Sequence, residues 1–123
     1  MKSINFNDLK LYQKPLSEDF IREFQDKVDW KDISRYQKLS ENFIREFKDE
    51  VYWFYISGHQ KLSENFIREF KDEVDWNRIS INQKLSEDFI REFKDKVNWG
   101  YIKPKYNIKR LLKKYPELLE FII

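Results

Sequence analysis

At 123 residues the chain has the length of one domain, and aromatic residues make up 18% of it, enough to build an apolar core. The absence of cysteine excludes a disulfide framework, a zinc–thiolate centre and a thiol nucleophile. The net charge is +2 but uneven: residues 1–95 carry 17 basic and 20 acidic side chains, and residues 96–123 carry 7 and 2. No apolar stretch approaches the roughly 20 residues that span a bilayer, and residues 1–20 lack a signal-peptide core, so we expect an intracellular protein without a membrane span.

The first residues are predicted to form an N-terminal cap. Segment 6–14 repeats the pattern of segment 30–38, with Phe6 in place of Trp30. Terminal units of repeat proteins cover the apolar side of the repeat next to them. We therefore expect residues 1–15 to supply a partial repeat that covers the first full one.

Residues 16–103 contain four tandem repeats with a period of 23 residues, which is typical of stacked helical repeats. The period is marked by four leucines and four tryptophans. These residues are Leu16, Leu39, Leu62 and Leu85, and Trp30, Trp53, Trp76 and Trp99. Because one pair of short helices cannot bury its apolar side alone, we expect neighbouring repeats to share a continuous core.

A serine begins the first helix of every repeat, where its hydroxyl can accept a backbone N–H. The four serines are Ser17, Ser40, Ser63 and Ser86. In the first repeat Phe20, Phe24 and Val28 then form part of one apolar stripe, which predicts a helix of about 11 residues.

A second helix of about 8 residues is predicted to start at each tryptophan. Asp29, Asp75 and Asn98 can cap this helix, whereas Tyr52 cannot, so the helix of the second repeat should start less firmly. Both helices are shorter than the roughly 12–15 residues at which an isolated helix becomes marginally stable, so packing must hold them.

The second and third repeats, Lys38–Gln60 and Lys61–Gln83, are identical at 18 of 23 positions, and the five differences fall on one face of the second helix. The differing pairs are Tyr52/Asp75, Phe54/Asn77, Tyr55/Arg78, Gly58/Ile81 and His59/Asn82. At about 100° per residue the constant residues lie on the opposite face. These are Trp53, Ile56, Ser57 and Gln60. We therefore expect an inner face with buried tryptophans and an outer face that varies.

Two sets of polar residues bear on how the repeats are joined. Gln37, Gln60 and Gln83 fall on the inner face, so we expect each to bond backbone groups between repeats. The first helices of the second and third repeats are identical even at solvent-facing positions such as Arg45 and Lys48. Either this polar face contacts other repeats or a partner, or the second helix has been diversified for binding, and the sequence leaves both explanations open.

The repeat pattern ends at Lys103, and residues 104–123 are predicted to form a C-terminal helical cap. Asn107 can cap a helix that runs to Tyr115, and Pro116 can open a last turn. The leucines of this segment give it an apolar side that can cover the last repeat. The whole chain is therefore predicted to be all-α, a short α-solenoid of two-helix repeats with helical end caps.

The run Gln60–Asp72, QKLSENFIREFKD, followed by Val74-Asp75-Trp76, resembles tandem repeats in uncharacterised proteins of giant DNA viruses of amoebae. The resemblance covers residues 14–102, and a composition rich in residues with AT-rich codons agrees with it. It implies a viral origin and a setting in the host cytoplasm. It carries no activity and no functional residue, and the basic C-terminal segment lies outside it.

His59 is the single histidine, so no set of imidazole ligands for zinc or iron can be assembled. No Ser/His/Asp spacing, glycine-rich phosphate loop or paired-carboxylate motif accompanies it. We therefore expect no cofactor, no metal site and no catalysis, and we interpret His59 as a surface or binding residue.

The segment Tyr52–Tyr55 is the strongest candidate for a binding site. If Trp53 faces the core, then the three aromatic residues around it face outward beside His59. Adjacent exposed aromatic residues are typical of the centres of protein interfaces. The predicted site consists of Tyr52, Phe54, Tyr55, His59, Arg35, Tyr36, Arg78, Ile81 and Tyr101.

These features predict a non-catalytic scaffold, a monomer or weak homo-oligomer, that binds a protein partner through the variable face of its second helices. If the viral resemblance holds, the partner is a host protein. The alternative is nucleic-acid binding through segment 96–114, which has seven basic residues and no acidic one. Against this alternative, residues 1–95 are net acidic, whereas a surface that tracks phosphates should be basic along its length.

Overall fold

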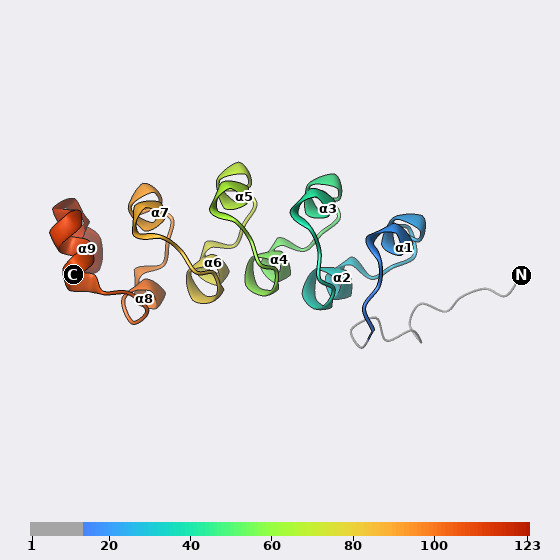
Figure 1. Ribbon diagram of the computed structural model, residues 1–123, viewed down its shortest axis with the longest axis horizontal. Coiled ribbons are helices and arrows are strands. Elements are labelled where there is room, and N and C mark those ends of the chain that lie inside the picture. Colours follow the sequence, from blue (N-terminus) through green and yellow to red (C-terminus); the bar gives the residue numbers. More distant parts are fainter. Residues whose placement is uncertain (1–13) are drawn as a thin grey trace, which may run out of the picture. The chain divides into compact units, whose positions relative to one another are not determined.

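In the computed structural model, which describes residues 14–123, every regular element of that range is a helix (Figure 1). The elements are α1 (Glu18–Glu23), α2 (Trp30–Tyr36), α3 (Glu41–Glu46), α4 (Trp53–His59), α5 (Glu64–Glu69), α6 (Trp76–Asn82), α7 (Glu87–Glu92), α8 (Trp99–Ile102), α9 (Ile108–Lys114), the 3₁₀ helix η2 (Pro116–Leu118) and α10 (Leu119–Ile122). The predicted all-α fold with two helices per repeat is confirmed. The N-terminal cap predicted for residues 1–15 lies, except for its last two residues, outside the described part of the chain.

The chain divides into two compact units, Met1–Gln60 and Lys61–Ile123, at a boundary between repeats. Unit 1 contains α1–α4, and unit 2 contains α5–α10. Within each unit the first helices of the repeats lie along one side and the second helices along the other (Figure 1). The second helices pack on each other, α2 on α4 in unit 1 and α6 on α8 in unit 2.

Each first helix starts at its serine as predicted but is shorter than predicted. Ser17 Oγ accepts the Phe20 N–H at 3.1 Å, and the same bond recurs at the other three serines. The helix ends after 6 residues instead of the expected 11 or so, because Phe24 leaves the helical region with φ −108° and ψ 27°. The chain then turns, and the Gln25 carbonyl accepts the indole N–H of Trp30 at 3.0 Å. The Gln25 carbonyl thus accepts a side-chain N–H instead of the backbone N–H that would bond to it if the helix continued.

The second helices begin at the tryptophans, and their caps follow the prediction. Asp29, Asp75 and Asn98 each accept a backbone N–H of the helix that they precede, whereas Tyr52 makes no side-chain cap bond. The Tyr52 N–H instead donates to Ser34 Oγ at 2.9 Å. Since Ser34 is fully buried in α2, this bond ties the start of α4 to the preceding second helix.

Isoleucines and phenylalanines form the core, whereas the tryptophans lie at its edge. The largest fully buried side chains are Ile21, Ile33, Phe43, Ile44 and Ile56 in unit 1, and Phe66, Ile67, Ile79, Phe89, Ile90, Ile102 and Leu111 in unit 2. Trp30 is buried at 9% exposure, but the prediction of a buried tryptophan is wrong for Trp53, Trp76 and Trp99, which are only half-buried. Each indole N–H donates to a backbone carbonyl five residues earlier, and this bond holds the ring edge at the rim of the core.

Glutamine amides join successive repeats in unit 1, as predicted. Gln60 Oε1 accepts the Leu39 N–H at 3.0 Å, and Gln60 Nε2 donates to the carbonyls of Ser34 at 3.0 Å and Gln37 at 2.6 Å. Gln37 Oε1 accepts the Leu16 N–H at 2.8 Å in the same way. Gln60 therefore satisfies the backbone where α2, α4 and the linker between repeats meet, and Gln37 does so for Lys14 and Leu16.

In unit 2, at the junction that follows the last glutamine, Tyr106 and Lys105 take over the backbone contacts that a glutamine makes in the earlier repeats. Gln83 Oε1 still accepts the Leu62 N–H at 3.3 Å, but the Leu85 N–H donates to the hydroxyl of Tyr106 at 2.8 Å. Lys105 Nζ donates to three backbone carbonyls of the same junction. Tyr106 follows Gln83 by 23 residues, so the spacing of the repeats reaches into the C-terminal segment.

Candidate interaction surface

The outer side of α2 and α4 carries three exposed aromatic side chains. Tyr36, Tyr52 and Phe54 are 43%, 50% and 44% exposed. On the opposite side of α4, Ile56 and Ser57 are fully buried. The division of α4 into an inner and an outer face therefore follows the prediction, and large apolar side chains cover the outer face.

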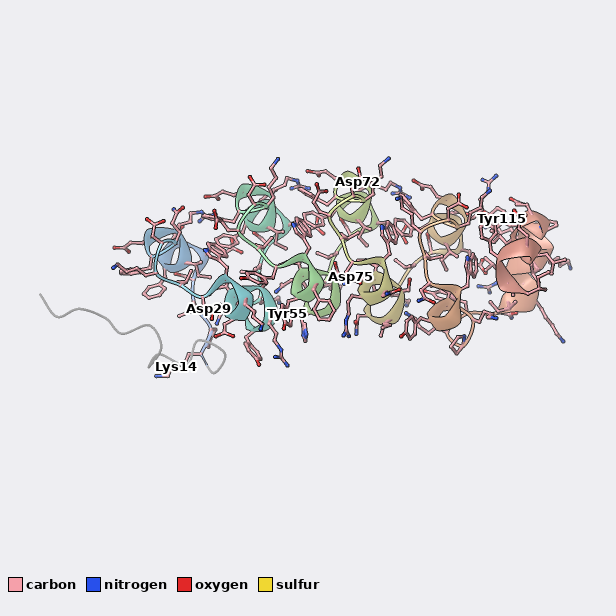
Figure 2. All side chains as sticks on the ribbon, turned by 180° about the vertical axis from the view of Figure 1, so that it is seen from behind. Lys14, Asp29, Tyr55, Asp72, Asp75 and Tyr115 are labelled. Carbon is pink, nitrogen blue, oxygen red and sulfur yellow. The ribbon has the colours of Figure 1, made fainter. Side chains whose placement is uncertain are left out.

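Five of the predicted site residues form one group, which we call the aromatic cluster: Arg35, Tyr36, Phe54, Tyr55 and His59. The Tyr55 ring is central: it meets Phe54 edge-on at 5.2 Å between centroids and lies 6.0 Å from the His59 ring. The Arg35 guanidinium lies over both tyrosine rings, 4.9 Å from Tyr36 and 5.6 Å from Tyr55. Tyr55 lies at the outer rim of unit 1 (Figure 2).

Lys31 belongs to this surface, although it is not among the residues predicted from the sequence. Its Nζ lies 5.9 Å from the centroid of the Tyr55 ring, on the same helix as Arg35. The spacing of four residues between Lys31 and Arg35 was the available signal, since such residues share a helix face. Asp32 lies beside them and is half-buried; burial and the nearby Asp29 carboxylate raise its pKa.

Tyr52 lies outside the aromatic cluster. Its ring makes no ring contact within the described chain, and it lines an open hollow of about 600 Å³ at the start of α4. Three acidic side chains, Asp29, Asp49 and Glu50, line the same hollow. The outer face of unit 1 is therefore acidic beside Tyr52 and basic around Tyr55.

The other three predicted site residues belong to unit 2. Tyr101 on α8 is 44% exposed, whereas Arg78 and Ile81 on α6 are half-buried. Ile81 lines an open hollow of about 370 Å³ together with Lys105 and Tyr106. The outer face of unit 2 thus has one exposed aromatic side chain.

The polar face of the first helices binds the neighbouring repeat within each unit. In unit 1 the Glu18 carboxylate accepts the N–H and hydroxyl of Ser40, at 2.7 and 3.0 Å, and Arg22 pairs with Glu46 at 2.9 Å. The hydrogen bond that Arg22 donates to the Glu46 carboxylate raises the pKa of Arg22. Unit 2 repeats both contacts: Glu64 binds Ser86, and Arg68 binds Glu92. Of the two explanations that the sequence left open, these contacts favour repeat-to-repeat contacts as the reason for the constant first helix.

Four of the seven basic side chains in segment 96–114 bind groups of the fold itself. These are Lys103 with the Ile122 carbonyl, Lys105 with the carbonyls of Ser80, Ile81 and Gln83, Arg110 with Glu87, and Lys114 with Asp88. Burial lowers the pKa of Lys105, and hydrogen bonds from Tyr115 and Lys114 lower the pKa of Asp88. The segment therefore presents much less free positive charge than its composition suggests.

Within residues 14–123 no group of three or more His, Cys, Asp or Glu side chains is arranged to hold a metal ion. None of the helices described is long and apolar enough to cross a membrane. The chain matches no protein-family model, no curated protein and no solved structure with which it was compared.

Proposed function

We propose that this protein is a non-catalytic helical-repeat scaffold that binds a protein partner through the outer face of its second helices, with the aromatic cluster as the main contact. One observation carries the proposal: Tyr36 and Phe54 are large aromatic side chains, yet both are close to half exposed on the outer face. Large aromatic residues beside an arginine are enriched at the energetically dominant centres of protein interfaces. The resemblance to viral repeats adds that the partner is a host protein of the cytoplasm.

Nucleic-acid binding is the weaker candidate because no observation favours it. Four of the seven positive side chains in segment 96–114 form hydrogen bonds or ion pairs with other groups of the fold. The exposed aromatic cluster is in unit 1, whose residues belong to the net acidic part of the chain. A surface that binds nucleic acid without such charge lacks the contribution that dominates affinity.

The test exchanges the outer face of the second repeat for that of the third. Phe54→Asn with Tyr55→Arg installs the residues that α6 carries at the equivalent positions, so folding should persist. Partners are captured from lysate with the wild type, quantified, and compared with those that the double variant captures. If these aromatic residues are hot spots, binding should weaken by about 2 kcal/mol or more.

Two measurements make this result decisive. Unchanged far-ultraviolet circular dichroism shows that the double variant is folded. Replacing exposed Lys48 and Asp49 by alanine serves as the control on the constant part of the repeat, in the turn that follows α3. A folded double variant that binds as well as the wild type, while the control variant does not, would contradict the proposal and move the site to that turn.

A further inference from the structure

Arg35 on the second helix has different contacts from the arginines of the first helices. Arg22 and Arg68 each bind a carboxylate of the neighbouring repeat at 2.9 Å. Arg35, by contrast, lies over the rings of Tyr36 and Tyr55 and makes no ion pair with any described residue, although the Asp32 carboxylate attracts it electrostatically. A guanidinium stacked on rings keeps its N–H groups directed outward, in the planar arrangement that fits a carboxylate.

Lys31 adds a second positive charge to the same spot. Its ammonium group lies over the Tyr55 ring and forms no ion pair within residues 14–123. The Asp29 carboxylate caps the helix, and Asp32 attracts both Lys31 and Arg35 electrostatically but forms an ion pair with neither. The helix α4 contains no acidic residue at all. The exposed rings of the aromatic cluster are thus bordered by two cations that have Asp32 near them and form no ion pair within residues 14–123.

Apart from Asp32, acidic side chains on this face lie beside Tyr52. Asp49 and Glu50 line the hollow there. A ligand with basic side chains around an apolar centre would meet Arg35 and Lys31 with like charge. A ligand with acidic side chains would offer each cation a carboxylate for a direct ion pair, which no described residue provides.

On the basis of the function proposed above, we infer that the partner docks through an acidic peptide segment. An apolar side chain of this segment lies on Phe54 and Tyr55, and Asp or Glu residues flanking it bind Arg35 and Lys31. The rings give contact area, and the two cations select the charge of the segment. The Arg35 guanidinium is already held by two rings, so little conformational freedom is lost when the carboxylate binds.

The experiment selects short random peptides displayed on phage against the full-length protein and then measures the selected peptides in solution by fluorescence anisotropy. We expect enrichment of peptides that combine Asp or Glu with an aromatic or leucine residue. Arg35→Glu should weaken their binding about tenfold or more, and Arg35→Lys less, because lysine keeps the charge but loses the planar donor pair. Lys71→Glu, an equal change in net charge at an exposed residue of unit 2, should leave binding unchanged. Added salt should weaken binding.

The outcomes separate this inference from the proposed function. Selected peptides that depend on Phe54 and Tyr55 but are neutral or basic, and that ignore Arg35→Glu, would overturn the inference alone. Peptides that bind the Phe54→Asn/Tyr55→Arg variant as well as the wild type would overturn both, as would a failure to select any peptide. Preferential binding of a single-stranded oligonucleotide through the same residues would replace the peptide by a nucleic acid and also overturn the inference.

Discussion

Gln60 shows how one polar residue can be essential to an apolar junction. It is 5% exposed, and its amide bonds two carbonyls and one N–H that no helix of the repeats satisfies. An unpaired buried backbone group costs about 1–3 kcal/mol, so a leucine here would be less favourable than the buried amide. Gln60 is therefore both buried and polar because the backbone groups that its amide satisfies are themselves buried.

The hydroxyl of Tyr106 allows a test of how much one hydrogen bond to a backbone N–H contributes to stability. Its hydroxyl accepts the Leu85 N–H at 2.8 Å, in the place that glutamine takes in the earlier repeats. Tyr106→Phe keeps the ring and leaves that N–H without an acceptor, so we expect a loss of about 1 kcal/mol in the free energy of unfolding. Urea denaturation measures it, with Tyr101→Phe as the matched control at an exposed tyrosine. Equal stability of both variants would show that water replaces the hydroxyl.

At the scale of the elements, α4 is the helix with an incomplete start. The equivalent helices α2 and α6 begin at Asp29 and Asp75, whose carboxylates accept backbone N–H groups, whereas the Tyr52 side chain caps nothing. Binding surface and helix stability therefore compete at this position. An exposed tyrosine offers contact area, and an aspartate would offer a cap.

Tyr52→Asp should consequently stabilise the protein while removing an exposed ring. A cap residue contributes about 1 kcal/mol, reduced here by repulsion from Asp49 and Glu50, which line the same hollow. We expect a net gain of about 0.5 kcal/mol, measured by urea denaturation at neutral pH. The gain should grow with added salt, because salt screens the repulsion. A loss of stability at high salt would indicate that the tyrosine ring itself supports the fold.

The shortness of the first helices has the same origin in all four repeats. Each helix stops after 6 residues, and the turn that follows offers a carbonyl to the indole of the next tryptophan. The apolar stripe through Val28 suggested a longer helix, because the apolar spacing alone does not distinguish a helix from a helix followed by a tight turn. The competing donor is a side chain, and only the folded chain brings it to the carbonyl.

At the scale of the molecule, the C-terminal segment closes unit 2 with its own versions of the repeat contacts. Arg91 pairs with Glu117 as Arg68 pairs with Glu92, and Phe121 packs on the Trp99 ring at 6.2 Å. Leu111, Leu118 and Ile122 are buried in this end. The segment thus satisfies charges, backbone groups and apolar surface that a further repeat would otherwise satisfy.

Deleting residues 104–123 should therefore destabilise the last repeat. The expected results are a red-shifted tryptophan emission, as Trp99 loses its cover, and aggregation or a loss of helicity. Replacing Lys96, Lys109 and Lys113 by glutamine is the control, because it removes charge without removing packing. A truncated protein that stays monomeric and melts like the full chain would instead show that the segment is a basic tail.

Much of the fold and part of the surface could be predicted from residue types at fixed spacing. The serine and aspartate caps, the junction glutamines and the outward face of Phe54 depend on local bonds or on helix periodicity, both of which a 23-residue repeat displays openly. The spacing of Lys31 and Arg35 shows that they share a helix face, but the contact of Lys31 with the Tyr55 ring depends on a different helix. The contact of Tyr106 depends on an N–H of a different repeat, and a single-helix pattern shows neither contact.

The sequence by itself determined that the chain is all-α, where each repeat starts and which side of α4 faces inward, because caps and apolar spacing act within a few residues. Only the tertiary structure decided which polar side chains are used within the fold. Arg22 and Arg110 bind carboxylates 24 and 23 residues away, whereas Arg35 lies over two rings and forms no ion pair with a described residue. Whether a charge is neutralised depends on what packing places opposite it, and that is a property of the assembled repeats.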